Sequence, residues 1–288
     1  MKRLLVPTDF SAEALKGLQT AVQIAKKLDA EIFLLHVFTQ EIIFYADYIS
    51  INELENMTEA DMQDTQKVNM TRLLKEQRLQ LSLLKRQYSQ VKISPFVAFN
   101  DMQQQLNNFV KEQKIDLLVM GSKGLENDDR LFAGSNAQKI IRTARCPVLT
   151  VKHYNPEATF RNICFASDFR QAPNAFITTL KAWQQAFGST LHLLKVITPS
   201  NFEISSQTLD TMESFARAYQ LQHYALHSFN AFVEYEGIIE FADRNQIDLI
   251  VMLTQGNTGI MHVLMGSIAE DVANMAKHPL LTFNLSYL

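Results

Sequence analysis

The chain has 288 residues, of which 47% are hydrophobic and 20% charged, so it can bury a large core and is not intrinsically disordered. Its 27 Lys and Arg residues against 30 Asp and Glu give a net charge of -3, with no basic excess for binding a nucleic-acid backbone. The two cysteines, Cys146 and Cys164, cannot form a disulfide framework, which favours a cytoplasmic location. No stretch approaches the ~20 apolar residues of a membrane span, and the first apolar run is too short for a signal peptide.

Two parts of the chain follow the same sequence plan. Residues 3–10, RLLVPTDF, return as residues 162–169, NICFASDF, at an offset of 159. Residues 115–120, IDLLVM, return as residues 247–252, IDLIVM, at an offset of 132. The difference between the offsets, 159 against 132, places 27 extra residues in the first copy between these blocks.

Each copy alternates short apolar runs with longer amphipathic segments, which is the pattern of β-α-β units around a parallel sheet. We therefore predict an α/β protein with two tandem, doubly wound, Rossmann-like domains, 1–154 and 155–288, each with a five-stranded parallel sheet flanked by helices. The strands are predicted, in chain order, at 2–7, 31–37, 91–99, 115–120 and 147–152, then at 161–167, 189–197, 223–229, 247–252 and 279–285.

The first helix and the insertion are predicted from local signals. Ser11 is the expected N-cap of a helix that follows the first strand. The extra residues fall in an insertion of about residues 40–90, and the absence of Gly and Pro from Thr58 to Tyr88 predicts one long helix there. Its apolar residues are most simply packed on the sheet. The alternative is a lid or partner surface formed by Ile43, Phe44, Tyr45 and Tyr48.

Glycines follow the fourth predicted strand and precede a predicted helix. Gly121 and Gly124 come first, and Gly134 and Ser135 follow at the start of the helix. Glycines let the backbone approach a ligand closely, and the free N–H groups of a helix start suit a phosphate. Such glycines can also serve only the turn. Their regular spacing, together with Asp9 at the end of the first strand, favours a ligand site at the carboxyl edge of the sheet.

With these motifs the sequence resembles the universal stress protein family in its tandem two-domain form. The family's nucleotide-binding branch is marked by Gly, two residues, Gly, nine residues, Gly and Ser or Thr, and residues 121–135 match every position. Further likenesses are VPTD at 6–9, LHV at 35–37 and CPVL at 146–149. The resemblance covers the chain apart from the insertion. It implies an adenine nucleotide alpha hydrolase-like fold and a site for ATP with a divalent cation, Mg.

The resemblance also implies roles for residues of the first domain. Asp9 would contact the ribose, the backbone at Val37 would read the adenine edge, and Pro7 and Thr8 would shape the adenine side. The implied nucleotide-binding set is completed, mainly around the phosphates, by Met120, Gly121, Ser122, Gly124, Gly134, Ser135 and Asn136.

The second domain departs from the pattern at its first glycine. Leu253 stands where the first domain has Gly121, and its side chain would take up ligand space and disfavour a positive φ. The residues that remain for a second site are Asp168, Val196, Gly256, Gly266 and Ser267. We expect this site to be weak or empty of nucleotide, with the alternative that an altered pocket still binds.

Motifs of other nucleotide enzymes are absent from the sequence. There is no G-x-x-x-x-G-K-[ST] loop, no G-x-G-x-x-G fingerprint and no His or Cys pattern for a metal, so we predict no catalytic residue and no resident metal. His36 is expected to be an ordinary strand histidine and not a general base. The leading hypothesis is an ATP-binding stress regulator. The alternatives are a slow ATPase or self-phosphorylating enzyme, and a scaffold with a degenerate pocket.

Partners follow from the duplication. In single-domain relatives two protomers pair, often through their last strands, so the resemblance implies that the two domains of this chain pair internally. Dimerisation of the whole chain is left open by the sequence. Neither nucleic acid nor a membrane is expected as a partner.

Overall fold

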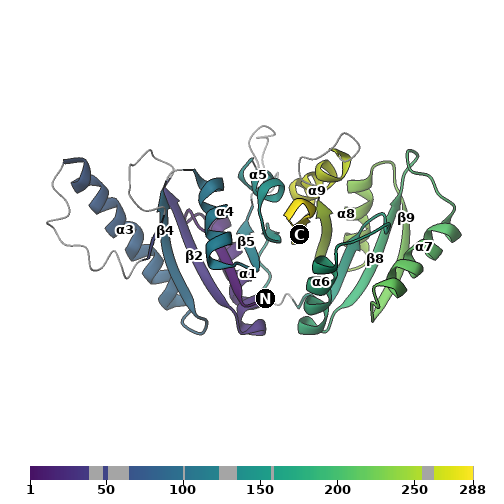
Figure 1. Cartoon of the computed structure of the whole chain (residues 1–288), viewed down its shortest axis with the longest axis horizontal. Coiled ribbons are helices and arrows are strands. Elements are labelled where there is room, and N and C mark those ends of the chain that lie inside the picture. Colours follow the sequence, from purple (N-terminus) through teal and green to yellow (C-terminus); the bar gives the residue numbers. More distant parts are fainter. Residues whose placement is uncertain are drawn as a thin grey trace. The chain divides into compact units, whose positions relative to one another are not determined.

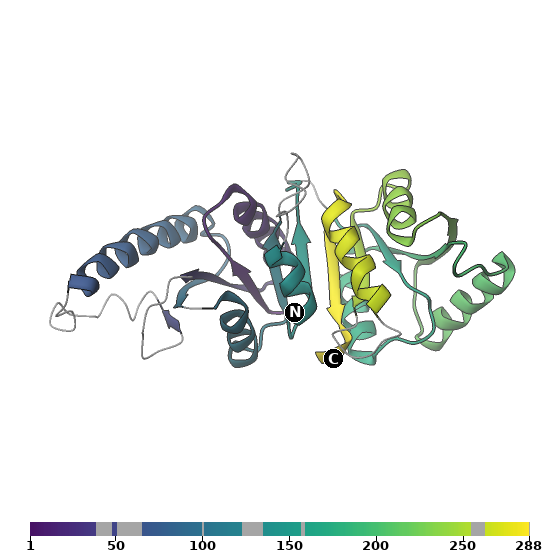
Figure 2. The ribbon, with the colours of Figure 1, turned by 90° about the horizontal axis from the view of Figure 1, so that it is seen from above.

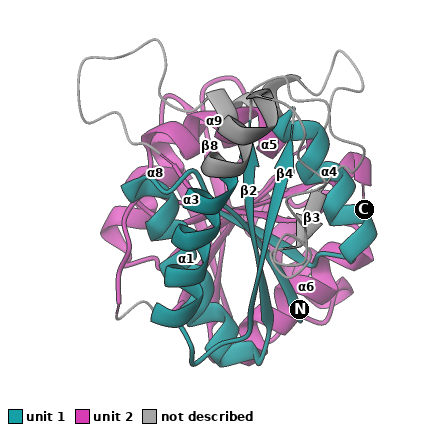
Figure 3. Ribbon diagram, turned by 90° about the vertical axis from the view of Figure 1, so that its left-hand side faces the viewer, with its two compact units in different colours: residues 1–120 teal, residues 121–288 magenta. Residues whose placement is uncertain are grey.

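The structure is a computed structural model. It describes residues 1–38, 48–50, 65–99, 101–122, 135–156, 159–254 and 263–287. Contacts between residues divide the chain into two compact units, 1–120 and 121–288, which Figure 3 shows in different colours. Each unit is a sheet covered by helices (Figure 1).

The first unit has the strand order β3-β4-β2-β1-β5. Its strands are β1 (Arg3–Pro7), β2 (Glu31–Phe38), β3 (Tyr48–Ser50), β4 (Ile93–Phe99) and β5 (Leu117–Gly121), the last of which ends one residue beyond the unit. Its helices are α1 (Ala12–Leu28), α3 (Thr65–Gln87) and α4 (Met102–Gln113). Strands β4, β2, β1 and β5 run parallel, as predicted, whereas the short β3 is antiparallel to β4 and was not predicted.

Helix α1 shows how local chemistry sets these elements. Ser11 is its N-cap, as predicted, and its hydroxyl accepts a hydrogen bond from the N–H of Ala14 at 3.2 Å. Glu13 in the first turn and Lys26 and Lys27 in the last turn complement the helix dipole. The buried face of the helix packs on the sheet, and the helix ends where Asp29 adopts a left-handed conformation with φ 51°.

The insertion of the first copy contributes α3 and β3. Figure 2 shows α3 as one long helix, and its residues 65–87 lie within the predicted helical stretch. Leu81 of α3 is fully buried and the helix contacts β4, whereas Leu79 and Leu83 are exposed. Ile43, Phe44 and Tyr45 of the expected lid lie outside the described residues, and Tyr48 pairs with Ala98 at the start of β3.

The second unit has the strand order β6-β11-β10-β7-β8-β9. Its strands are β6 (Val148–Val151), β7 (Asn162–Ala166), β8 (Thr190–Ile197), β9 (Tyr224–Asn230), β10 (Leu249–Thr254) and β11 (Leu280–Asn284). Its helices are α5 (Ser135–Thr143), α6 (Asn174–Phe187), α7 (Ser205–Ala218), α8 (Glu234–Arg244), α9 (Val263–Met275) and a 3-10 turn (Leu285–Tyr287). Strands β11, β10, β7, β8 and β9 are parallel, so the predicted five-stranded parallel sheet of the second copy is confirmed.

Strand β6 belongs to the second unit although its sequence closes the first copy. It pairs antiparallel with β11, in the register Leu149 to Leu281. Threonine hydroxyls support this pairing: Thr150 donates to the carbonyl of Leu280 at 3.4 Å, and Thr282 donates to the carbonyl of Val148 at 3.3 Å. This long-range pairing explains why the division by contacts falls at residue 120, upstream of the sequence boundary predicted near 155.

The hydrogen bonds next to the pairing of β6 with β11 have an internal two-fold pattern. Asn284 donates its side-chain N–H to the carbonyl of Arg142 at 2.6 Å. The Lys152 ammonium donates in the same way to the carbonyl of Asn274. Because 152 and 284, like 142 and 274, are 132 residues apart, the two bonds join equivalent positions of the copies.

Other hydrogen bonds also repeat from copy to copy. In the first copy, Asp116 Oδ2 accepts from the backbone N–H groups of residues 2–3 at 2.6 and 3.0 Å. In the second, Asp248 Oδ2 accepts from those of residues 161–162 at 2.7 and 2.9 Å. The duplication therefore extends from sequence to individual polar contacts. Among the helices that the described residues form, none combines the length and the apolar character needed to cross a membrane.

Candidate functional site

The carboxyl ends of β1 and β2 place the first group of predicted site residues at one edge of the sheet. The two strands are parallel neighbours, with Pro7 opposite Leu35. The N–H of Thr8 donates to the carbonyl of Leu35 at 2.9 Å, which extends the ladder one residue past β1. Asp9 follows β1 directly and Val37 lies near the end of β2, so this edge presents both residues.

The turn after β1 is held by short polar contacts around a strained residue. Phe10 has a φ of 65°, a left-handed conformation that is uncommon for an aromatic residue. Its N–H donates to the Thr8 hydroxyl at 3.1 Å. Asp9 Oδ1 accepts from both the N–H and the hydroxyl of Ser11, at 3.0 and 2.5 Å. These bonds fix the direction of the Asp9 carboxylate, which lies on an exposed residue.

The Asp9 carboxyl is ionised at neutral pH. Burial acts to raise its pKa, but the hydrogen bonds from Ser11 outweigh burial, so the pKa is lowered from its ordinary value. An ionised carboxylate accepts hydrogen bonds and donates none. The group is therefore suited to receive hydroxyl protons of a ligand, such as those of a ribose.

The side chain of His36, on β2, contacts the same turn. The side chain is buried, and its Nδ1 lies 2.8 Å from the carbonyl oxygen of Thr8, which can only accept, so Nδ1 carries the proton. Its ring contacts those of Phe10 and Phe38, with centroids 4.8 and 4.7 Å away. Burial lowers the pKa of His36, against the opposing effects of the Thr8 carbonyl and the Asp9 charge, so the ring is neutral at pH 7. A neutral ring in these contacts positions the turn and has no proton to give at Nε2.

The glycine motif begins where β5 ends. Met120 is buried in the first unit, and Gly121 and Ser122 open the second. The N–H of Ser122 donates to the carbonyl of Val151 at 2.9 Å, whereas its hydroxyl is buried and has no hydrogen-bond partner among the residues that the structure describes. A buried polar group without a partner costs ~1 to 3 kcal/mol, so a hydroxyl left this way is suited to a ligand oxygen.

The structure thus describes part of the predicted first site. Pro7, Thr8, Asp9, Val37 and Met120 lie at the carboxyl edge of β1, β2 and β5. The helix predicted to follow the motif is α5, which begins at Ser135 and continues through Asn136, while Gly124 and Gly134 lie outside the described residues. The sequence did not single out Phe10 or the bond from Ser11 to Asp9, although the Asp-Phe pair recurs in both copies.

The second copy repeats the turn with other side chains. Phe169 has a φ of 58°, and its N–H donates to the Ser167 hydroxyl at 3.1 Å. Asp168 Oδ1 accepts from the N–H of Arg170 at 3.3 Å. At the other end of the motif, helix α9 begins at Val263, so the predicted site residues Gly266 and Ser267 lie within its first turns and not at its start. Gly256 lies outside the described residues.

Comparison with known proteins decides the family. A model of the universal stress protein family matches residues 1–152 and again residues 159–284. The chain belongs to the universal stress protein family. It carries the family's domain twice, in tandem, with the Rossmann-like α/β fold.

Individual universal stress proteins resemble all or part of the chain. One from Methanocaldococcus jannaschii is 29% identical over 154 residues, which are 52% of this chain and 82% of that protein. A crystal structure of a universal stress protein from Archaeoglobus fulgidus has a TM-score of 0.70 at 19% identity and covers 98% of both chains, which shows the shared fold. A universal stress protein solved in complex with cAMP aligns over 43% of this chain and 97% of its own, at 18% identity and a TM-score of 0.36.

A metal centre is not formed by the described part of the chain. Among those residues there is no group of three or more His, Cys, Asp or Glu side chains that could hold a metal ion.

Proposed function

We propose that this universal stress protein is a cytoplasmic regulator that binds an adenine nucleotide, ATP with Mg, in its first domain, residues 1–154. The observation that carries the proposal is the intact glycine motif from Gly121 to Ser135, whose Ser122 hydroxyl is buried without a partner in the described chain. Turn chemistry alone gives no reason to bury an unsatisfied hydroxyl, whereas a phosphate oxygen would satisfy it.

The residues at the edge fit the parts of such a ligand. The ionised Asp9 carboxylate is suited to accept protons from the ribose hydroxyls, and the backbone near Val37 is suited to the adenine edge. By the family resemblance, the glycine motif of residues 121–135 would take the phosphates, to which the free N–H groups of a helix start are suited. A Mg ion would be held mainly by the phosphate oxygens and water, which is its ordinary mode of binding. Backbone donors also explain how a chain with a net charge of -3 can bind an anion.

Regulation requires that the nucleotide prefer one state of the protein over another. We propose that the two domains pair within the chain, and that occupancy of the first site changes this pairing or the binding of a partner. The antiparallel pairing of β6 with β11 supports the first part, because these are the last strands of the two copies. To test internal pairing, one cysteine would be placed in each of these two strands. If the disulfide forms only between two chains and never within one chain, internal pairing is refuted.

Calorimetry with Mg-ATP tests the binding proposal. We expect wild type to bind, Gly134→Asp to lose binding, and Asp9→Asn to bind about 10-fold more weakly, equal to ~1.4 kcal/mol for a lost charged acceptor. Asp168→Asn is the matched control, since it makes the same change at the equivalent position of the second domain. Absence of binding to wild type would refute the proposal. Phosphate release by wild type above that of Gly134→Asp would instead favour the slow ATPase.

A further inference from the structure

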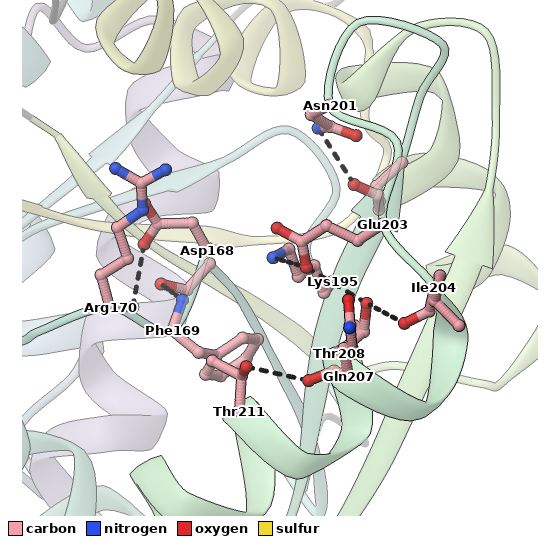
Figure 4. A network of polar contacts seen from close by, with 12 residues as sticks. Asp168, Phe169, Arg170, Lys195, Asn201, Glu203, Ile204, Gln207, Thr208 and Thr211 are labelled. Atoms are coloured by element: carbon pink, nitrogen blue, oxygen red, sulfur yellow. Dashed lines mark hydrogen bonds and ion pairs between the residues drawn. The ribbon is translucent and has the colours of Figure 1, made fainter.

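A buried lysine stands at the second domain's counterpart of His36. Lys195 on β8 is 159 residues after His36, and only 9% of its side chain is exposed. Its ammonium lies 2.6 Å from Glu203 Oε2, and Figure 4 shows the two side chains pointing toward each other. A buried ammonium needs such a partner, because burial of an unpaired charge is costly.

Glu203 comes from the segment that connects β8 to α7, residues 198–204. Its carboxylate also accepts a hydrogen bond from the hydroxyl of Thr208, a fully buried residue of α7, at 3.2 Å (Figure 4). The hydrogen bond from Lys195 lowers the pKa of Glu203, so this carboxylate is charged at neutral pH. The segment is thus tied to both β8 and α7 through one carboxylate.

Asn201 ties the same segment to the end of β8 at a second point. Its Oδ1 accepts from the N–H of Thr198 at 2.6 Å. Its Nδ2 donates to the carbonyl of Val196 at 3.4 Å and to Glu234 Oε1 at 3.2 Å. Val196 is the counterpart of Val37, so the backbone carbonyl at this position of the second domain already has a donor from its own chain.

The acid of the second site is engaged as well. Asp168 Oδ2 lies 3.5 Å from the guanidinium of Arg170, which stands where the first domain has Ser11. Figure 4 shows Arg170 and Asp168 together beside the Lys195 and Glu203 pair. The counterparts of Asp9 and His36 are therefore each in an ion pair within the second domain, and the carbonyl of Val196 has a side-chain donor.

We infer that the second domain's site is closed by its own chain: residues 198–204 take the place of a base at the end of β8, and the Lys195–Glu203 pair locks them there. Adenine carries no negative charge, so a base that displaced Glu203 would leave the Lys195 ammonium buried without a counter-charge. The protein then binds one nucleotide per chain. Only this stoichiometry rests on the proposed function, since the closed segment is a property of the second domain alone.

Amine labelling of the full chain tests the closed segment without any nucleotide. We expect acetic anhydride to modify Lys195 at least about 10-fold more slowly than the exposed Lys277, and Glu203→Gln to remove most of this protection, because opening releases the ammonium to water. The matched control is Glu240→Gln, which breaks the surface pair with Arg244 on helix α8. Equal labelling of Lys195 and Lys277 in wild type would overturn the inference, and this comparison does not depend on the variant folding.

Amide hydrogen exchange and calorimetry complete the test. Exchange in residues 198–204 is expected to accelerate in Glu203→Gln and in Asn201→Ala, and an unchanged rate in both variants would overturn the lock. Wild type is expected to bind one Mg-ATP per chain. Binding of two nucleotides per chain, with the second still bound in Asp9→Asn, would overturn the inference. Absence of any nucleotide binding would refute the proposed function, and the labelling and exchange experiments would then decide on the closed segment.

Discussion

The ion pair between Arg142 of α5 and Glu270 of α9 offers the most quantitative test of how the second unit is held together. Nε and Nη2 of Arg142 donate to the two carboxylate oxygens of Glu270, and the exposed side-chain fractions are 56% for Arg142 and 9% for Glu270. The ion pair does not recur at the equivalent positions of the two copies, which hold the uncharged Asn274 and Gln138. Its loss therefore cannot be compensated by a symmetric contact.

The unequal burial predicts unequal costs for the two partners. Breaking a fully buried pair costs ~3 to 5 kcal/mol because a charge is left without compensation. In Arg142→Met, the buried Glu270 carboxylate loses its partner, but water reaches the space of the half-exposed arginine, so we expect a loss of about 2 kcal/mol in the free energy of unfolding. In Glu270→Gln, the arginine can turn to water, so we expect a loss of about 0.5 to 1 kcal/mol.

Urea unfolding followed by tryptophan fluorescence measures both losses. The chain has 1 Trp, and Trp183 is fully buried in α6 of the second unit, so the signal reports on the unit that contains the pair. The matched control is Arg244→Met, which breaks the surface pair with Glu240 on α8 and is expected to cost less than ~0.5 kcal/mol. If Arg142→Met costs no more than this control, or less than Glu270→Gln, the reasoning from burial is wrong.

Three further predictions concern the second unit. His192 Nδ1 and His227 Nε2 lie 3.1 Å apart, and burial lowers the pKa of both rings, in His227 with a contribution from the charge of His192. As the pH falls through the ordinary histidine pKa of ~6.5, the unfolded chain therefore binds more protons than the folded chain. The contribution of these rings to stability is full above that pH and is lost as the pH falls. The urea midpoint of His227→Gln should therefore depend less on pH between 7.5 and 5.5 than that of wild type. Burial raises the pKa of the Cys164 thiol, so a thiol reagent should modify it only in urea, and rapid native labelling would contradict this. A Cβ at Gly237 would lie 2.6 Å from Val196 Cγ1, so Gly237→Ala should destabilise the unit by ~1 to 3 kcal/mol, and an unchanged melting temperature would show that the neighbour can move.

Local sequence signals were sufficient for most of the fold. Apolar runs of strand length predicted strands such as β2 and β8 to within a residue or two, because these strands are buried on both faces and carry few polar residues. The Ser11 cap and the helix after the glycine motif could also be predicted from the sequence, because caps and helix starts depend on neighbouring residues. These features were predictable because their determinants lie within a few positions of each other.

The features that sequence did not reveal depend on distant residues. Strand β3 is only three residues long and exists by pairing with the edge of β4, and no local pattern marks it. The antiparallel register of β6 on β11 joins positions more than a hundred residues apart. Lys195 interrupts an apolar strand, and only the fold shows that its ammonium is buried against Glu203. Long-range pairing and burial of a charge are properties of the folded chain and not of a sequence window.

The two copies place the same backbone turn at the same edge and differ in the charge that surrounds it. In the first, Asp9 is held by the neutral Ser11 and has no cationic side chain within ion-pair distance among the described residues. In the second, cations occupy the positions of Ser11 and His36, and each is matched by an acid: Arg170 by Asp168 and Lys195 by Glu203. A carboxylate without a cation keeps its negative charge available to donors of a ligand, whereas a matched pair has this charge balanced by its own chain. If the proposed function and the closed second site hold, the side chains at two positions per copy decide whether one backbone frame takes a polar ligand or is satisfied from within.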